Sequence, residues 1–129
     1  ITNRQSESAV HLKTNVLKNK PNADLCFVLA TLYDNMGFTL DAEAYYKKTI
    51  EIDAKYIEAD YNLAVMYYNL AVDKNRILNE TDRSSKLFKQ LLSERNILLK
   101  KAEPLFKRVI SINPKEIQKI LKSISSSQS

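Results

Sequence analysis

The sequence is short of the residues that form tight turns, with one glycine and three prolines among 129 residues. All-β folds depend on glycine and proline in their turns, so this shortage argues strongly against a β-sandwich or barrel. It also excludes glycine-rich phosphate loops, which need several glycines. One cysteine and one histidine cannot form a Cys/His zinc site or an internal disulfide. What remains is an all-α domain, for which we expect no metal and no cofactor.

Long apolar runs are also missing. The longest, over residues 25–33, is far shorter than the about 20 residues that a membrane-spanning helix needs. No signal peptide is recognisable, and because the chain begins at Ile1 we expect a fragment or a processed chain. We expect a soluble protein with no transmembrane segment. A lone cysteine is compatible with a cytoplasmic or an exported (periplasmic) location, so the compartment stays open.

Apolar residues recur at intervals of three and four through most of the chain, which predicts amphipathic helices. Proline at position 104 falls inside the fifth helix, where we expect a bend because the apolar pattern continues past it. The expected helices cover about residues 6–19, 22–35, 39–52, 56–78, 83–112 and 115–123.

A few residues mark the expected helix boundaries. Pro21 prevents the first helix from continuing into the second. Gly37 is expected to end the second helix in a left-handed conformation. Thr39 is the expected N-cap of the third helix, and Thr81 or Asp82 that of the fifth.

Small and aromatic residues repeat along the chain at a distance of 34 residues. The set Leu29, Ala30 and Tyr33 is followed, 34 residues later, by Leu63, Ala64 and Tyr67. Each copy then continues with an alanine and, four residues on, an aromatic residue: these are Ala42 and Tyr46, then Ala102 and Phe106, with Pro114 after the second pair. This order on paired helices resembles the tetratricopeptide repeat (TPR) family. The sequence departs from the family pattern at its Trp position, where Cys26 and Asp60 stand.

The resemblance implies an all-α fold in which antiparallel helix pairs stack into an α–α superhelix. It implies about five helices and a short C-terminal helix, with the repeated aromatic residues in the core. The expected organisation is a single domain over 1–124, made of a partial repeat (1–21), a first full repeat (22–55), a second (56–114) and a C-terminal helix (115–124), followed by a disordered tail (125–129).

The second repeat is longer than the first. Tyr33 and Ala42 are 9 residues apart, whereas Tyr67 and Ala102 are 35 apart, which places a 26-residue insertion near 72–101. The insertion is rich in leucine and isoleucine, so we expect it to extend both helices of the pair into a long hairpin. The chain thereby resembles bacterial tetratricopeptide proteins with an extended last helix pair.

The expected hairpin seam joins two arms, with apolar residues that face each other. These seam residues are Leu70 and Ile77 on one arm and Leu87, Leu91 and Leu98 on the other. Three further apolar residues fall outside the seam: Leu92, Ile97 and Leu99. They either widen the seam inside the hairpin or form an exposed strip that binds a partner or a second chain.

Charge is unevenly distributed along the chain. Residues 1–82 hold 9 Lys/Arg and 12 Asp/Glu, whereas residues 83–129 hold 11 Lys/Arg and 3 Asp/Glu, for a total of +5. The basic half is either a solvated helix face or a surface that binds anions, an acidic protein or a membrane. Nucleic acid is not expected, because this half has few aromatic residues for stacking. The basic stripe consists of Lys86, Lys89, Arg95, Lys100, Lys101, Lys107 and Arg108.

No residue pattern points to catalysis, so we do not expect an enzyme. His11 lies on a terminal helix, and the helical pattern brings no Cys or Ser close to it. Cys26 is expected to be a small buried hydrophobe. The resemblance instead implies a protein–protein interaction scaffold that binds a peptide or helical segment in its concave groove. Alternatives are a structural module that self-associates, as a homodimer through the hairpin or the repeat ends, and a binder of anionic surfaces. The implied groove residues are Asp24, Phe27, Val28, Thr31, Asp34, Asn35, Glu58, Tyr61, Asn62, Val65, Tyr68 and Asn69.

Overall fold

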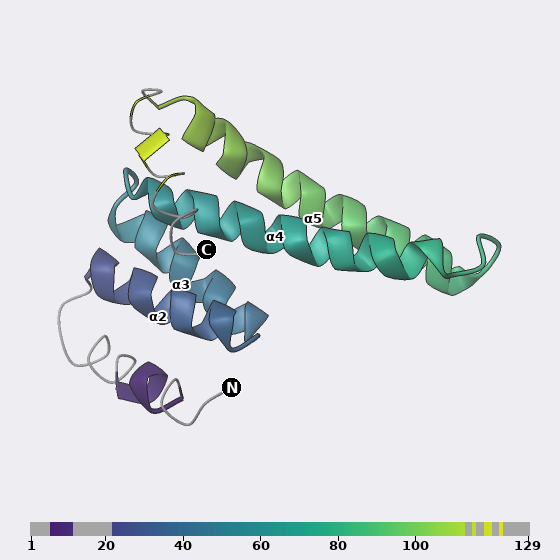
Figure 1. Cartoon of the computed structure of the whole chain (residues 1–129), viewed down its shortest axis with the longest axis horizontal. Coiled ribbons are helices and arrows are strands. Elements are labelled where there is room, and N and C mark those ends of the chain that lie inside the picture. Colours follow the sequence, from purple (N-terminus) through teal and green to yellow (C-terminus); the bar gives the residue numbers. More distant parts are fainter. Residues whose placement is uncertain (1–5, 12–21, 113–114, 116–117, 120–121, 123–129) are drawn as a thin grey trace. The chain divides into compact units, whose positions relative to one another are not determined.

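The computed structural model describes residues 6–11, 22–112, 115, 118–119 and 122, and the regular elements in these ranges are all helical (Figure 1). The chain divides into two compact units, residues 1–60 and 61–129. The long helices are α2 (Ala23–Asn35), α3 (Thr39–Ile52), α4 (Ile57–Asn79) and α5 (Lys86–Ile110). The all-α prediction is confirmed. Residues 6–11 are also helical, and the rest of the predicted first helix lies outside the described residues.

Helix α2 begins at a side-chain cap. The Asn22 side-chain oxygen accepts hydrogen bonds from the backbone N–H groups of Asp24 (2.8 Å) and Leu25 (3.3 Å). Two N–H groups that the helix leaves unpaired at its start are thus satisfied. The Asp24 carboxylate in the first turn also interacts favourably with the positive end of the helix dipole.

The glycine at position 37 ends α2, as the sequence predicts. Gly37 has φ of 81°, and its N–H donates to the Asp34 carbonyl (3.0 Å). The N–H of Phe38 reaches back to the Tyr33 carbonyl (2.9 Å), which completes a Schellman motif. The rings of Phe38 and Tyr33 lie 6.2 Å apart, which supplies the apolar contact typical of this motif.

The prediction that Thr39 caps α3 is wrong by one residue. Thr39 is the first helical residue, and Phe38 stands at the N-cap without a side-chain hydrogen bond. The reason is the compact turn: Phe38 is already fixed by its bond to Tyr33, and its carbonyl accepts the N–H of Ala42 (2.9 Å). Phe38 therefore completes the C-terminal motif of α2 and is also the N-cap of α3.

The first unit is built around the contact of α2 with α3, which lie side by side (Figure 1). The repeated residues Ala30, Ala42 and Tyr46 are buried, as the repeat pattern predicts. The helical residues 6–11 also contribute to this core through Ala9. The residues of the cluster and its half-buried neighbours are Ala9, Cys26, Leu29 and Met36, with Leu25, Leu32, Tyr33 and Tyr45.

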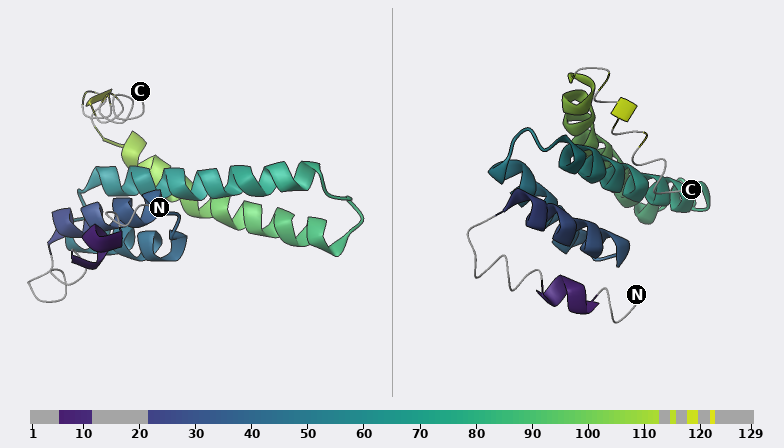
Figure 2. Two further views of the ribbon diagram at one scale, coloured as in Figure 1. Left: turned by 60° about the horizontal axis from the view of Figure 1, so that its bottom comes forward. Right: turned by 60° about the vertical axis from the view of Figure 1, so that its left-hand side comes forward.

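In the second unit, the long arms of α4 and α5 run side by side as a hairpin (Figures 1 and 2). The Lys74 ammonium lies 2.7 Å from the Glu94 carboxylate, and Arg95 donates to the Asn75 amide oxygen at 2.8 Å. The buried side chains of these arms are Leu63, Ala64, Met66, Tyr67, Ala71, Leu78, Leu91, Ala102 and Val109. The long helix pair is thus present, while its origin as an insertion into a second repeat stays a prediction.

The predicted hairpin seam is wrong for two residues. Ile77 and Leu87 are exposed, whereas Leu91 is buried and both Leu70 and Leu98 are half-buried. The neighbour of Ile77 on α4, Leu78, is buried in its place. Adjacent residues lie about 100° apart around a helix, so the buried stripe of α4 passes through Leu78 and leaves Ile77 outside it.

The predicted start of α5 is also corrected. Neither Thr81 nor Asp82 caps the helix: the Thr81 hydroxyl donates to the Ile77 carbonyl (2.6 Å), and Asp82 accepts from the N–H of Ser84 (3.0 Å). This local turn delays the helix until Lys86, where Ser85 is the N-cap and its hydroxyl accepts the Phe88 N–H (3.1 Å).

Helix α5 continues through Pro104, as predicted, and ends at Ile110 rather than 112. Beyond it, the described residues 115, 118–119 and 122 are helical. The rest of the predicted last helix and the tail over 125–129 lie outside the described residues.

Replacing Gly37 should destabilise the first unit through the backbone alone. Nothing lies within 4 Å of an added Cβ, but φ of 81° is costly for L-residues other than asparagine and aspartate. Gly37→Ala should lower the free energy of unfolding by about 1 kcal/mol, measured by urea denaturation. Gly37→Asn should lose clearly less. Equal losses for the two variants would contradict this account.

Removing the α5 cap should weaken the hairpin. Ser85→Ala deletes the hydroxyl that accepts the Phe88 N–H and should reduce stability by about 1 kcal/mol in thermal or urea unfolding. Ser93→Ala is the control, since Ser93 is exposed within α5 and alanine favours the helix. A Ser85→Ala variant as stable as Ser93→Ala would show that the cap is not used.

Candidate functional site

The six predicted groove residues of α2 share one face of the helix. Their spacing places them together, and the buried residues Cys26, Leu29 and Ala30 occupy the other side. Asp24, Val28 and Asn35 are exposed, whereas the other three are half-buried: these are Phe27, Thr31 and Asp34. The structure thus brings the six together on an accessible face, and their role in binding stays a prediction.

Phe27 is less available for binding than the sequence suggests. Its ring lies 5.1 Å from the ring of Tyr56 and 6.1 Å from that of Tyr46, both in tilted arrangements. Tilted aromatic pairs at this separation are favourable contacts. Phe27 therefore holds α2 against α3 and against the residues that lead into α4, and only part of its surface is open.

The two carboxylates of this face each accept a tyrosine hydroxyl. Tyr56 donates to Asp24 at 2.8 Å, and Tyr46 donates to Asp34 at 3.0 Å. A carboxylate has about four acceptor sites, so each can still bind a further donor. Because the partners are neutral tyrosines, both negative charges remain uncompensated by these bonds.

Burial shifts the titration of several of these groups. Burial raises the pKa of Asp34, against a smaller opposing effect of the Tyr46 hydrogen bond. Burial, followed by the hydrogen bond to Asp24, raises the pKa of Tyr56 well above its usual range. Burial also raises the pKa of Tyr45, which stacks on Tyr33 at 5.8 Å.

The predicted groove residues of α4 lie on one face of that helix as well. Glu58 in the first unit and Tyr68 and Asn69 in the second are exposed. The remaining three, Tyr61, Asn62 and Val65, are half-buried. The Tyr61 ring meets the Phe106 ring edge-on at 6.4 Å, so this face borders α5 within the second unit.

An apolar cleft of about 370 Å³ lies between α4 and α5 in the second unit. The sequence pattern predicts separate roles for its residues: Tyr68 in the groove, Leu99 in the surplus apolar set and Phe106 in the core. The spacing of seven that links Leu92, Leu99 and Phe106 is the sequence signal that indicates their common flank. The lining residues are Tyr68, Leu99, Ala102, Glu103, Phe106, Lys107 and Ile110.

A polar cleft of about 270 Å³ lies nearer the hairpin turn. Two arginines, Arg83 and Arg95, line it together with amide side chains from the end of α4. The guanidinium of Arg95 donates to the amide oxygens of Asn75 (2.8 Å) and Asn96 (3.1 and 3.3 Å). The lining residues are Asn75, Leu78, Asn79, Thr81, Arg83, Phe88, Leu92 and Arg95.

The residues of the predicted basic stripe are not equivalent. All are exposed except Arg95, which is half-buried. Lys107 lies 2.8 Å from the Glu103 carboxylate, and Lys101 lies 5.5 Å from the centroid of the Tyr67 ring, where a cation–π contact forms. Lys107 thus pairs within α5, whereas Lys101 and Arg95 contact side chains of α4.

The two residues considered for chemistry differ in burial. Cys26 is buried, and burial raises the pKa of its thiol, while His11 is exposed. Within the described residues, no three His, Cys, Asp or Glu side chains are grouped so as to hold a metal ion. None of the described helices is long and apolar enough to cross a membrane.

Residues 23–56 match the tetratricopeptide repeat family. The match covers α2, α3 and the turn that follows, nearly the same residues as the predicted first full repeat (22–55), and it confirms a tetratricopeptide repeat in this segment. No curated protein and no solved structure matches the chain. The second repeat over 56–114 and the likeness to bacterial proteins with an extended last pair stay predictions.

Asp34→Asn should change the pH dependence of stability. The raised pKa means that the folded state holds the proton more tightly, so stability falls as pH rises from about 3.8 toward the raised value. Asparagine keeps an acceptor for the Tyr46 hydroxyl and removes this titration, so the variant should gain stability relative to the native chain over that interval. Urea unfolding between pH 3 and 7 measures the difference.

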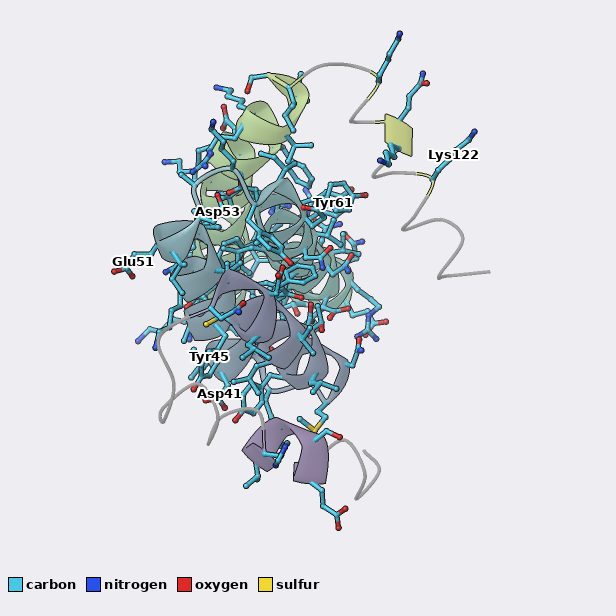
Figure 3. All side chains as sticks on the ribbon, turned by 90° about the vertical axis from the view of Figure 1, so that its left-hand side faces the viewer. Asp41, Tyr45, Glu51, Asp53, Tyr61 and Lys122 are labelled. Carbon is cyan, nitrogen blue, oxygen red and sulfur yellow. The ribbon has the colours of Figure 1, made fainter. Side chains whose placement is uncertain are left out.

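The matched control is Glu51→Gln, because Glu51 is exposed near the end of α3 and points away from the helix (Figure 3). Asp41 and Tyr45 lie one helical turn apart on the same side of α3 in this view. A pH profile of Asp34→Asn parallel to that of the native chain would contradict the assigned shift.

Proposed function

We propose that this chain, which carries a tetratricopeptide repeat at residues 23–56, is a non-catalytic module that binds a partner protein on the exposed face of α2. A tetratricopeptide repeat is a protein–protein interaction module, and repeats of this kind generally have no catalytic role. The choice of the α2 face as the binding surface rests on the six residues of α2 that share one accessible face.

The observation that carries the proposal is the composition of that face. Val28 is 44% exposed, on a helix whose other side is buried against the core. The carboxylates Asp24 and Asp34 stand near the two ends of α2, about 15 Å apart along the helix. Asn35 adds an exposed amide that can pair with a peptide backbone. A partly apolar segment of neutral or mildly basic character complements this surface.

The corresponding face of α4 contributes to the same function within its own unit. Its exposed residues Tyr68 and Asn69 again combine apolar area with an amide. Tyrosine is favoured in interfaces because its ring buries area while its hydroxyl keeps a hydrogen bond. Both faces would act on extended or helical segments of a partner, with no covalent chemistry.

Charging the α2 face should reduce partner binding. Val28→Glu removes exposed apolar area and adds a third negative charge, and the amount of partner retained in affinity capture with the intact chain should fall about tenfold. Leu40→Glu is the matched control, because Leu40 is an exposed apolar residue of α3 outside this face. Circular dichroism should show both variants to be as helical as the native chain.

Two outcomes would contradict the proposal. Equal capture by Val28→Glu and by the native chain would remove α2 from the interface. Light scattering at two concentrations tests the self-association alternative. Concentration-dependent dimers that Val28→Glu leaves intact, with no other protein retained, would favour a structural module.

A further inference from the structure

The hairpin of the second unit leaves apolar side chains uncovered along one flank of α5. Leu92, Leu99, Phe106 and Ile110 follow one another at spacings of seven, seven and four, so they share that flank. Leu99 and Ile110 are exposed, and Phe106 and Leu92 are half-buried. From the first to the last of them is about 27 Å along the helix, or about five turns.

The apolar cleft gives this flank a concave section. Tyr68, which is 50% exposed, forms the α4 wall, and Leu99, Phe106 and Ile110 form the α5 wall above Ala102. Its volume of about 370 Å³ falls within the range of natural ligand pockets. A cleft of this size admits apolar side chains from one face of a helix or strand.

Positive charge surrounds the same flank. Helix α5 carries seven Lys/Arg and two Asp/Glu. Both acidic residues are already in ion pairs, since Glu94 lies 2.7 Å from Lys74 and Glu103 lies 2.8 Å from Lys107. The charge left for a ligand is therefore positive, and a ligand of negative charge is complementary to it.

The polar cleft places Arg95 of α5, together with Arg83 from the preceding turn, at one end of the apolar row. Leu92 lines that cleft with Arg83 and Arg95, and it lies two helical turns before Leu99 of the apolar cleft. Amide oxygens of Asn75 and Asn96 orient the Arg95 guanidinium without neutralising it. A guanidinium has five donors, so donors remain for a carboxylate.

We propose that this flank of the hairpin binds an acidic amphipathic helix of a partner protein. The apolar residues of that helix enter the cleft between Tyr68 and Leu99, and its carboxylates meet Arg83 and Arg95. The proposal goes beyond the α2 and α4 faces, because it concerns the α5 flank and shares only Tyr68 with them. A lipid surface is the weaker fit, since it needs apolar side chains that project outward, whereas Ala102 and Phe106 lie inside a cleft.

The test uses the intact chain and synthetic peptides in fluorescence anisotropy. The probe is a labelled helical peptide of about 18 residues, with leucines spaced three and four apart and glutamates elsewhere. One comparison peptide replaces each glutamate by lysine, and another has the same composition in scrambled order. The acidic amphipathic peptide should bind at least about tenfold more tightly than either. Equal binding of the lysine peptide or of the scrambled peptide would overturn the proposal.

Variants then locate the peptide. Leu99→Glu and Ile110→Glu should each weaken binding about tenfold, because each places a negative charge in the apolar contact. Ile97→Glu is the matched control: Ile97 is 51% exposed on the same helix and lines neither cleft. Its affinity should stay within about twofold of the native chain. Equal losses for the three variants would mean that the peptide does not sit in the cleft.

The role of the arginines is tested by comparing two double variants that have the same net charge. The double variant Arg83→Gln/Arg95→Gln and the control Lys86→Gln/Lys89→Gln each remove two positive charges from this region. Only the first should weaken binding strongly, because the two lysines are exposed and line neither cleft. Equal effects would indicate a diffuse attraction and would contradict a defined site.

Two further experiments distinguish a partner helix from a lipid surface and from a second copy of the chain. Vesicles with phosphatidylserine that bind the chain and compete with the peptide, with losses in the same variants, would indicate a lipid surface instead. Dimers seen by light scattering and abolished by Leu99→Glu would indicate a second copy. The α2 variant Val28→Glu should retain peptide binding, so failure of this site and failure of the α2 site are distinguishable.

Discussion

The close packing of α2 on α3 is the constraint on which the first unit depends. Ala30 and Ala42 are fully buried, and small residues at such positions let two helices approach closely. Aromatic rings fill the space beside them, with Tyr33 stacked on Tyr45. The fully buried ring of Tyr46 brings its hydroxyl to the Asp34 carboxylate. The core therefore fixes the geometry of a carboxylate on the exposed face, so the surface available to a partner follows from how the helices pack.

The same packing rule has a different result in the second unit, because its helices are longer. Ala64, Ala71 and Ala102 are buried, but two antiparallel helices can cover only one stripe on each other. The apolar sector of α5 is wider than that stripe, since Leu91 is buried in it while Leu99 remains exposed. An uncovered flank is the physical consequence of a long two-helix layer with a wide apolar sector. The apolar cleft lies along that flank.

Signals that act locally were predictable from the sequence. The glycine at position 37 predicts a left-handed helix end from local sequence alone. The 34-residue period locates the buried Ala30, Ala64 and Tyr67, although Tyr33 is only half-buried. Features that depend on competition between neighbours were not. Phe38, not Thr39, is the N-cap of α3, because the hydrogen bond from its N–H to the Tyr33 carbonyl fixes Phe38 in the preceding turn. The clefts depend on which side of α4 faces α5, which the spacing of apolar residues alone does not determine, and Ile77 is exposed for the same reason.

Net charge and charge placement have separate consequences in this chain. An excess of positive charge over residues 83–129 creates a field that attracts anions of any kind, and salt screens it. Placement decides which residues can discriminate. Lys107 pairs with Glu103 within α5, and Lys101 lies over the Tyr67 ring of α4, so both already interact with neighbouring side chains. Arg95 differs because its hydrogen-bond partners are neutral amides, which orient the guanidinium without neutralising its charge. A guanidinium in a fixed orientation beside apolar surface favours a ligand whose carboxylates and apolar side chains have the matching separation. A diffuse basic face does not select for that separation.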